Sequence, residues 1–180
     1  MKELSLNILD IAENSVKARA TLTEILLTET DDQLELVIRD DGCGMTEEVV
    51  RGVTDPFYTT RTTRKVGLGL PLLKLEAEMT GGSMEVLSKA QAEHPADHGT
   101  VVTARFVTSH IDCPPLGDVV ETMVTLVQGH PDTDFYFSHK TEEREVAMDT
   151  RELRAVLEDV PLNSYEVLQW IEAFLREQYQ

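Results

Sequence analysis

The chain has 180 residues, of which 41% are hydrophobic and 27% are charged, a balance typical of a folded globular protein. Its formal net charge of −17 disfavours nucleic acid as a partner, because binding to phosphates requires clustered lysine and arginine. No apolar run approaches the roughly 20 residues of a membrane helix, and carboxylates interrupt the N-terminus where a signal peptide is apolar. With two cysteines and no CxxC pair, the composition predicts a cytoplasmic protein that contacts no membrane.

The negative charge is distributed unevenly along the chain. Residues 1–108 carry 11 Lys+Arg and 18 Asp+Glu, whereas residues 109–180 carry 5 and 15. We interpret the surplus in the second part either as solubilising charge or as a surface for a basic partner.

Residues 2–18 are predicted to form an amphipathic helix, because Leu4, Ile8 and Ile11 recur at helical spacing. Asp10 and Asn14 lie four residues apart and therefore share a second, polar face. A carboxamide oxygen there can ligate Mg²⁺, and a carboxylate can orient or deprotonate water. For this segment alone, a solvated helix face is the alternative.

Residues 21–28 and 34–38 are predicted to form a β-hairpin, which the glycine-broken loop DDGCGM follows. Asp40 stands at the end of the second strand, where a carboxylate can accept a hydrogen bond from an exocyclic amine. Gly42 and Gly44 permit a tight turn and a close approach of backbone to ligand. The alternative is an ordinary Asp-Gly turn.

Residues 54–67 are predicted to be a loop, and a helix follows over 68–79. Arg61, Arg64 and Lys65 could clamp the β- and γ-phosphates of a nucleotide, with a solvated loop as the alternative. Gly67 and Gly69 begin the helix, where backbone N–H groups attract phosphate, although such glycines can also serve packing alone.

The remaining elements are predicted from shorter patterns. Strands are expected over 83–87 and 100–107, and Pro114-Pro115 marks a boundary. Beyond it we expect a helix over 116–128, a hairpin of 134–139 with 145–149, and two helices capped by Asp149 and Asn163. All five histidines are expected to lie at the surface rather than to act as catalysts or metal ligands.

Taken together, these segments resemble the histidine-kinase-like ATPase superfamily, which includes gyrase-type, mismatch-repair and chaperone ATPases. LDIAENSVKARA is similar to its N box, DDGCGM to its DxGxG box, DPFYTTRTTRKVGLGL to its lid and GxG box, and HGTVVTARF to its final strand. The resemblance covers about residues 1–108. It implies a Bergerat-type α/β sandwich: a mixed, largely antiparallel sheet with helices on one face, and ATP between helices and lid. Residues 109–180 would form a small acidic α+β appendage of helix, hairpin and two helices.

The resemblance also assigns roles. Asn14 would ligate Mg²⁺, and Asp40 would bind the adenine amine between Gly42 and Gly44. The other ATP-binding residues would be Met45, Phe57, Arg61, Arg64, Lys65, Gly67, Gly69, Leu70 and Thr100, the last supporting Asp40 from a neighbouring strand. Asp10 stands where these ATPases usually carry glutamate, which leaves Glu13 as a rival catalytic base.

These features predict an ATP-Mg²⁺-binding protein that hydrolyses ATP slowly or phosphorylates a protein partner. No dimerisation helix with a phosphoacceptor histidine precedes the N box, so a complete histidine kinase is not expected. The whole chain is also similar to stand-alone ATP-binding proteins associated with iron-hydrogenase clusters. Two alternatives stay open. One is a nucleotide-gated interaction module without turnover, which docks a partner through the lid or the acidic C-terminal segment; the other is a degenerate fold that has lost ATP.

Overall fold

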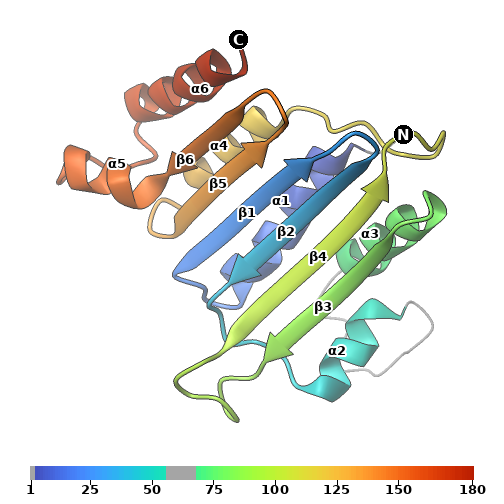
Figure 1. Ribbon diagram of the computed structural model, residues 1–180. Coiled ribbons are helices and arrows are strands. Elements are labelled where there is room, and N and C mark those ends of the chain that lie inside the picture. The colour runs from blue at the N-terminus through green and yellow to red at the C-terminus, as the bar shows by residue number, and fades with distance from the viewer. Residues whose placement is uncertain (1–2, 56–67) are drawn as a thin grey trace.

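The protein is built on one mixed β-sheet. A computed structural model describes residues 3–55 and 68–180. The six strands lie in the order β3-β4-β2-β1-β5-β6 (Figure 1). All neighbouring strands are antiparallel except β1 and β5, which are parallel. The strands are β1 (Leu22–Glu29), β2 (Gln33–Asp40), β3 (Ser83–Lys89), β4 (Gly99–Val107), β5 (Asp134–Lys140) and β6 (Glu145–Asp149).

Helices cover one face of this sheet. Figure 1 shows α1, α3 and α4 behind the strands. Alternation along the strands explains why one face is covered. Leu34, Leu36 and Ile38 of β2 are buried, whereas the alternate residues Glu35 and Arg39 face the other way. The expected two-layer α/β fold is confirmed. The helices are α1 (Leu4–Lys17), α2 (Glu47–Thr54), α3 (Gly69–Met79), α4 (Val119–Gly129), α5 (Thr150–Leu157) and α6 (Tyr165–Tyr179).

Residues 109–180 extend the same sheet and the same helical layer. β5 pairs with β1 in parallel from Leu22↔Asp134 to Thr28↔Lys140. Helix α4 packs against α1 on one side and α6 on the other. A single cluster of buried side chains runs from Leu4 to Leu175. The sheet therefore continues across the boundary that the sequence predicts near residue 108.

Two polar side chains of α6, Tyr179 and Gln178, bond to the sheet. The prediction that every histidine lies at the surface is wrong for His139, which is 5% exposed on β5. Its Nδ1 lies 2.8 Å from the hydroxyl of Tyr179, and its Nε2 lies 2.7 Å from Glu29. Burial, followed by the charge of Glu29, raises the pKa of Tyr179 above its ordinary value, so the hydroxyl that bonds to His139 stays protonated. The side chain of Gln178 pairs with both backbone groups of Ala147 on the edge strand β6.

Of the two helix caps that the sequence predicts, the one at Asp149 is confirmed. Thr46 accepts a hydrogen bond from the backbone of Val49, and Asp149 accepts one from Arg151. The prediction that Asn163 caps the last helix is wrong by one residue, since the N-cap is Ser164. No helix in the described parts of the chain is long and apolar enough to cross a membrane.

Candidate functional site

A cavity of about 390 Å³ opens between α1, the end of β2, the start of β4 and the start of α3. Its walls are mainly apolar, with a carboxylate and a carboxamide among them. It is lined by Ile11, Asn14, Ser15, Lys17, Ala18, Ile38, Asp40, Cys43, Gly44, Met45, Leu70, Thr100 and Val102. The structure thus brings together six residues that the sequence assigned to one pocket: Asn14, Asp40, Gly44, Met45, Leu70 and Thr100.

Asp40 is held rigidly at the edge of this cavity. Ser15 donates its hydroxyl to one carboxylate oxygen at 2.7 Å, and the backbone N–H of Gly42 donates to the other at 2.9 Å. Each carboxylate oxygen keeps a further lone pair. Asp40 can therefore accept a hydrogen bond from a ligand amine without giving up either internal partner.

The glycine loop 42–45 is hydrogen-bonded to the chain on both sides, and the close approach of Lys89 leaves room only for glycine at position 44. A side chain at Gly44, where φ is +65°, would lie 2.0 Å from the carbonyl oxygen of Lys89. The N–H of Cys43 donates to Ala18 on the helix side, and its carbonyl accepts from Gln91 beyond β3. His98 Nδ1 lies 2.6 Å from the carbonyl oxygen of Gly42.

Thr100 supports Asp40 through the backbone, because the two residues are register partners in the β2–β4 pair. Its hydroxyl bonds with the hydroxyl of Ser88 at 2.8 Å. Ser88 also accepts from the backbone N–H of Met45 at 2.8 Å. Three strands and the loop are thereby connected around the base of the cavity.

Helix α3 brings its first turn to the cavity. Leu70 is 3% exposed and closes one wall, and a side-chain carbon built on Gly69 would lie 3.5 Å from Cβ of Asp10. The buried Asn7 of α1 donates to Glu76 of α3 and ties the two helices together. The backbone N–H groups that start α3 therefore lie beside the polar face of α1, where an anionic ligand would meet them.

The two rival carboxylates have different surroundings. Asp10 is solvent-exposed and lies beside the start of α3. Glu13 bonds through both oxygens to Nε2 of His130, each at 2.9 Å. Neither carboxylate is among the residues that line the cavity. Of the two, Asp10 lies beside the start of α3, whereas Glu13 lies beside His130 at the end of α4.

Sequence reasoning missed three residues that organise the site: Ser15, Ser88 and His98. Ser15 carried a usable signal, since it occupies the next position of the Leu4, Ile8, Ile11 stripe, and a serine on a buried stripe needs a polar partner. The predicted residues Phe57, Arg61, Arg64, Lys65 and Gly67 lie outside the described residues. Among the described residues, no group of three or more His, Cys, Asp or Glu side chains could hold a metal ion.

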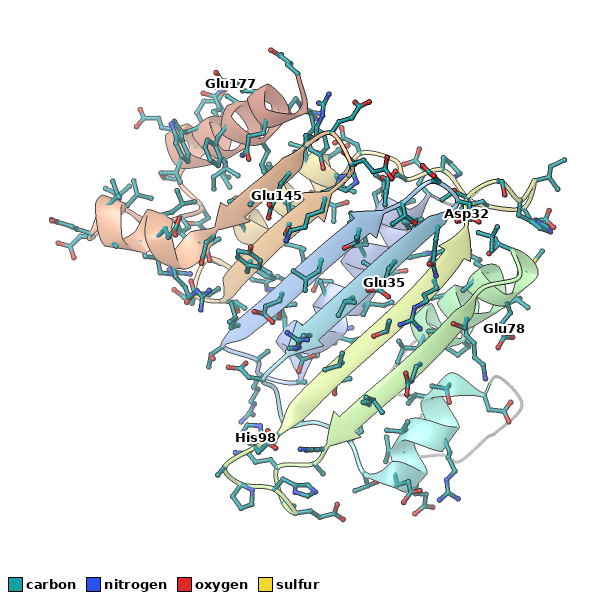
Figure 2. The ribbon with its side chains drawn as sticks, viewed as in Figure 1. Asp32, Glu35, Glu78, His98, Glu145 and Glu177 are labelled. Carbon is teal, nitrogen blue, oxygen red and sulfur yellow. The ribbon has the colours of Figure 1, made fainter. Side chains whose placement is uncertain are left out.

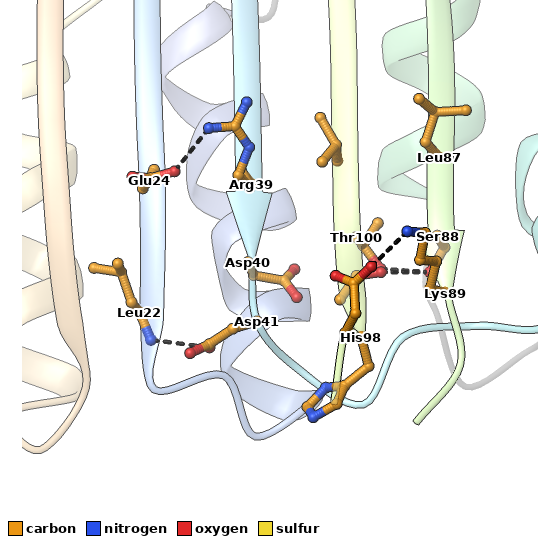
Figure 3. Close-up of a pocket in the computed structure, with 13 residues that line it drawn as sticks. Leu22, Glu24, Arg39, Asp40, Asp41, Leu87, Ser88, Lys89, His98 and Thr100 are labelled. Atoms are coloured by element: carbon orange, nitrogen blue, oxygen red, sulfur yellow. Dashed lines mark hydrogen bonds and ion pairs between the residues drawn. The ribbon is translucent and has the colours of Figure 1, made fainter. Parts of the chain in front are cut away.

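A larger hollow of about 630 Å³ lies on the open face of the sheet (Figure 3). Its charged side chains are paired with one another: Arg39 with Glu24 at 3.1 Å, and Lys89 with Asp97 at 2.6 Å. Burial raises the pKa of Asp41, but hydrogen bonds from Thr21 and Leu22 outweigh this and hold it below its ordinary value. Because its charges are satisfied internally, the hollow is a weaker candidate than the cavity beneath α1.

Comparison with known proteins agrees with this geometry. Residues 1–110 match the family described as histidine kinase-, DNA gyrase B-, and HSP90-like ATPase, and the chain belongs to this family. Membership of this family implies ATP binding. The cavity bounded by α1, the glycine loop and α3 is the feature of the fold that suits such a ligand.

Particular relatives come from sensor kinases. The tetrathionate sensor histidine kinase TtrS of Salmonella typhimurium is 31% identical over 98 residues, which are 54% of this chain and 16% of that protein. The signal transduction histidine-protein kinase AtoS of Escherichia coli is 32% identical over 88 residues, 49% of this chain and 14% of that protein. The chain thus matches only a small part of these relatives.

Solved structures show the same fold at low identity. The Aquifex aeolicus MutL ATPase domain complexed with ADP has a TM-score of 0.52 and 15% identity, and the match covers 94% of this chain and 67% of that one. The N-terminal domain of a DNA repair protein has a TM-score of 0.54 and 14% identity, over 83% of this chain and 53% of that one. The first of these matches reaches well beyond residue 110, consistent with the continuous sheet.

Proposed function

We propose that the chain binds ATP with Mg²⁺ in the cavity beneath α1 and uses it for slow hydrolysis or for phosphoryl transfer to a protein partner. One observation carries the proposal: an apolar-walled cavity presents Asp40, held by Ser15 and Gly42, next to Asn14 and the first turn of α3. The apolar walls suit a purine ring, and the carboxylate suits its exocyclic amine. The residues present therefore fit the nucleotide that the family implies.

The phosphates and the metal ion would lie on the polar side of α1. Asn14 offers a carboxamide oxygen, a hard ligand suited to Mg²⁺, which would neutralise charge on the phosphates. Asp10 would position the attacking water or hydroxyl beside the start of α3. Arg61, Arg64 and Lys65 would bind the β- and γ-phosphates, and Phe57 would pack near the base. We place the reaction in the cytoplasm, since both Cys43 and Cys113 are free thiols.

A second candidate, a nucleotide-gated interaction module without turnover, is favoured by the state of the two carboxylates. Asp10 is shorter than the glutamate usual in these ATPases, and Glu13 is engaged with His130. Such a module would bind ATP as tightly but release no phosphate. Because the sheet continues into residues 109–180, such a module would have a rigid body that could transmit the effect of nucleotide binding to a partner.

Phosphate release separates the two candidates. We expect wild-type protein to release phosphate from ATP-Mg²⁺ above background, and Asp10→Asn to reduce the rate by about two orders of magnitude. Glu13→Gln is the matched control, since it makes the same chemical change three residues away and should retain the rate. Equal, background-level rates in all three proteins, each still binding ATP, would favour the module.

A further inference from the structure

The outer side of α6 carries an aromatic surface that has no role in the nucleotide site. Trp170, the only tryptophan in the chain, is 50% exposed. It stacks on Phe174 with ring centroids 4.9 Å apart and an interplanar angle of 9°. Glu166 and Glu177 lie four residues before and seven residues after Trp170, so helical spacing places all of them on one stripe, the Trp170 face. Both glutamates are exposed.

The Trp170 face is rigid, because the opposite side of α6 is firmly attached. Val167, Ile171 and Leu175 are buried against the rest of the molecule. Tyr179 and Gln178 bond to His139 and to the backbone of Ala147, as described above. A flat aromatic pair on a fixed helix costs little conformational entropy on binding, and tryptophan is enriched at the energetic centres of interfaces.

The charge around the Trp170 face is negative, and the cations of residues 109–180 are engaged elsewhere. Each of the five cations in residues 109–180, all of which the structure describes, already has a partner within the molecule. Arg176, the one cation of α6, bonds to Asp118 at 2.8 Å and Glu172 at 3.2 Å. The others are Lys140 with Glu145, Arg144 with the carbonyl of Tyr179, Arg151 with Asp149, and Arg154 with Asp134. No ion pair joins Glu166 or Glu177 to a described residue.

We propose that the Trp170 face docks a cationic segment of a partner protein, with an arginine or lysine side chain over the indole between Glu166 and Glu177. A cation over tryptophan gains from the ring quadrupole, and the flanking carboxylates add electrostatic attraction. A second copy of this chain, nucleic acid and anionic lipid are all repelled by a molecule of net charge −17. This surface belongs to α6 and not to the nucleotide cavity, so its function is tested in the absence of ATP.

The single tryptophan makes the test direct. Full-length protein is titrated at low salt with a short amphipathic peptide of arginine and leucine, while the emission of Trp170 is recorded. The control peptide has glutamate in place of each arginine. We expect a saturable change in emission with the basic peptide only, and weaker binding as salt increases. No change in emission with the basic peptide would overturn the proposal.

Matched charge reversals distinguish a specific face from general attraction to a polyanion. Glu166→Lys/Glu177→Lys should weaken peptide binding by about tenfold. Glu78→Lys/Glu85→Lys makes the same change in net charge at the other end of the sheet, where Figure 2 shows Glu78 far from Glu177, and should leave affinity within about twofold. Equal weakening by both pairs would refute docking at Trp170.

Trp170→Ala, followed by calorimetry, should also weaken binding of the basic peptide by about tenfold, while the circular dichroism spectrum stays unchanged.

Discussion

At the scale of single residues, the site depends on how firmly Asp40 is held. Its two carboxylate oxygens accept hydrogen bonds from a helix side chain and from the following loop, so the direction of the carboxylate is set before any ligand arrives. Such preorganisation reduces the entropy lost on binding. The same reasoning gives Ser15 and Gly44 a positioning role, although neither needs to contact the base.

Ser15→Ala should weaken ATP-Mg²⁺ binding by about tenfold, because Asp40 loses a charge-assisted hydrogen bond worth about 1.5 kcal/mol. Ser5→Ala is the matched control: Ser5 is equally buried on α1 but lies far from the cavity lining. Calorimetric titration of both variants checks the expectation. Equal affinities for the two variants would show that Ser15 does not position the carboxylate.

Gly44→Ala should destabilise the fold by more than about 2 kcal/mol, because the new methyl group would meet the carbonyl of Lys89 at a positive φ. Gly129→Ala, at a site with no atom within 4 Å, should be neutral or slightly stabilising. Urea unfolding of the two variants measures the difference. A Gly44→Ala protein as stable as wild type would mean that the loop is not clamped.

Whether a site residue could be predicted from the sequence depends on how far away in the chain its partners lie. Asp40, Gly42, Gly44 and Asn14 could be identified from sequence because their signals, a strand end, a glycine loop and helical spacing, are local. Ser88 and His98 could not, because their partners in the loop lie 43 and 56 residues away. Only the fold brings them together.

At the scale of elements, α6 is held to the sheet by side-chain contacts that join residues far apart in the chain. The side chain of Gln178 imitates a neighbouring strand: it accepts from the N–H of Ala147 at 3.0 Å and donates to its carbonyl at 3.1 Å. It thereby occupies part of the free edge of β6, which would otherwise offer a template for pairing with another chain. The sequence predicted the helix from its periodicity but gave no indication of this contact.

Gln178→Ala should lower the free energy of unfolding by about 1–2 kcal/mol and speed amide exchange at Ala147. Gln169→Ala, on an exposed part of the same helix, should change stability by less than about 0.5 kcal/mol. Urea unfolding with amide hydrogen exchange checks both. Unchanged exchange at Ala147 would contradict the edge contact.

The free energy of unfolding should depend on pH through Asp118, which lies where α4 meets α6. The hydrogen bond from Arg176, helped by the backbone N–H of Glu121, holds the pKa of Asp118 below its ordinary 3.8 although partial burial raises it. A carboxyl whose folded pKa is lowered stabilises the fold above its unfolded pKa and loses this effect as the pH falls. Asp118→Asn should therefore reduce stability at neutral pH, and the difference from wild type should shrink below pH 3.8. Thermal unfolding of both proteins across this pH range measures the difference in stability. A difference that stays constant with pH would contradict this role of Asp118.

At the scale of the whole molecule, one sheet and one helical layer join the two parts of the chain. The sequence predicted both sets of elements, but it could not show that β5 pairs with β1, since their register partners are separated by more than 100 residues. Parallel pairing between such distant segments depends on the packing of α4 against α1. We therefore expect residues 1–108 and 109–180 to unfold together.

Two probes can test this expectation. The emission of Trp170 reports on the C-terminal part, and far-ultraviolet circular dichroism reports on the whole chain. Both should give the same urea midpoint, as a single cooperative unit requires. Two separated transitions would mean that residues 109–180 form an independent appendage.

The central claim is that the cavity beneath α1 is an ATP site organised by Asp40. Calorimetric titration of the folded full-length protein with ATP-Mg²⁺ tests it most directly. We predict a one-to-one complex with a dissociation constant in the micromolar range, lost in Asp40→Ala while circular dichroism is unchanged. Well-folded wild-type protein that gives no heat with ATP-Mg²⁺ or ADP-Mg²⁺, or an Asp40→Ala variant that binds as tightly as wild type, would contradict the account.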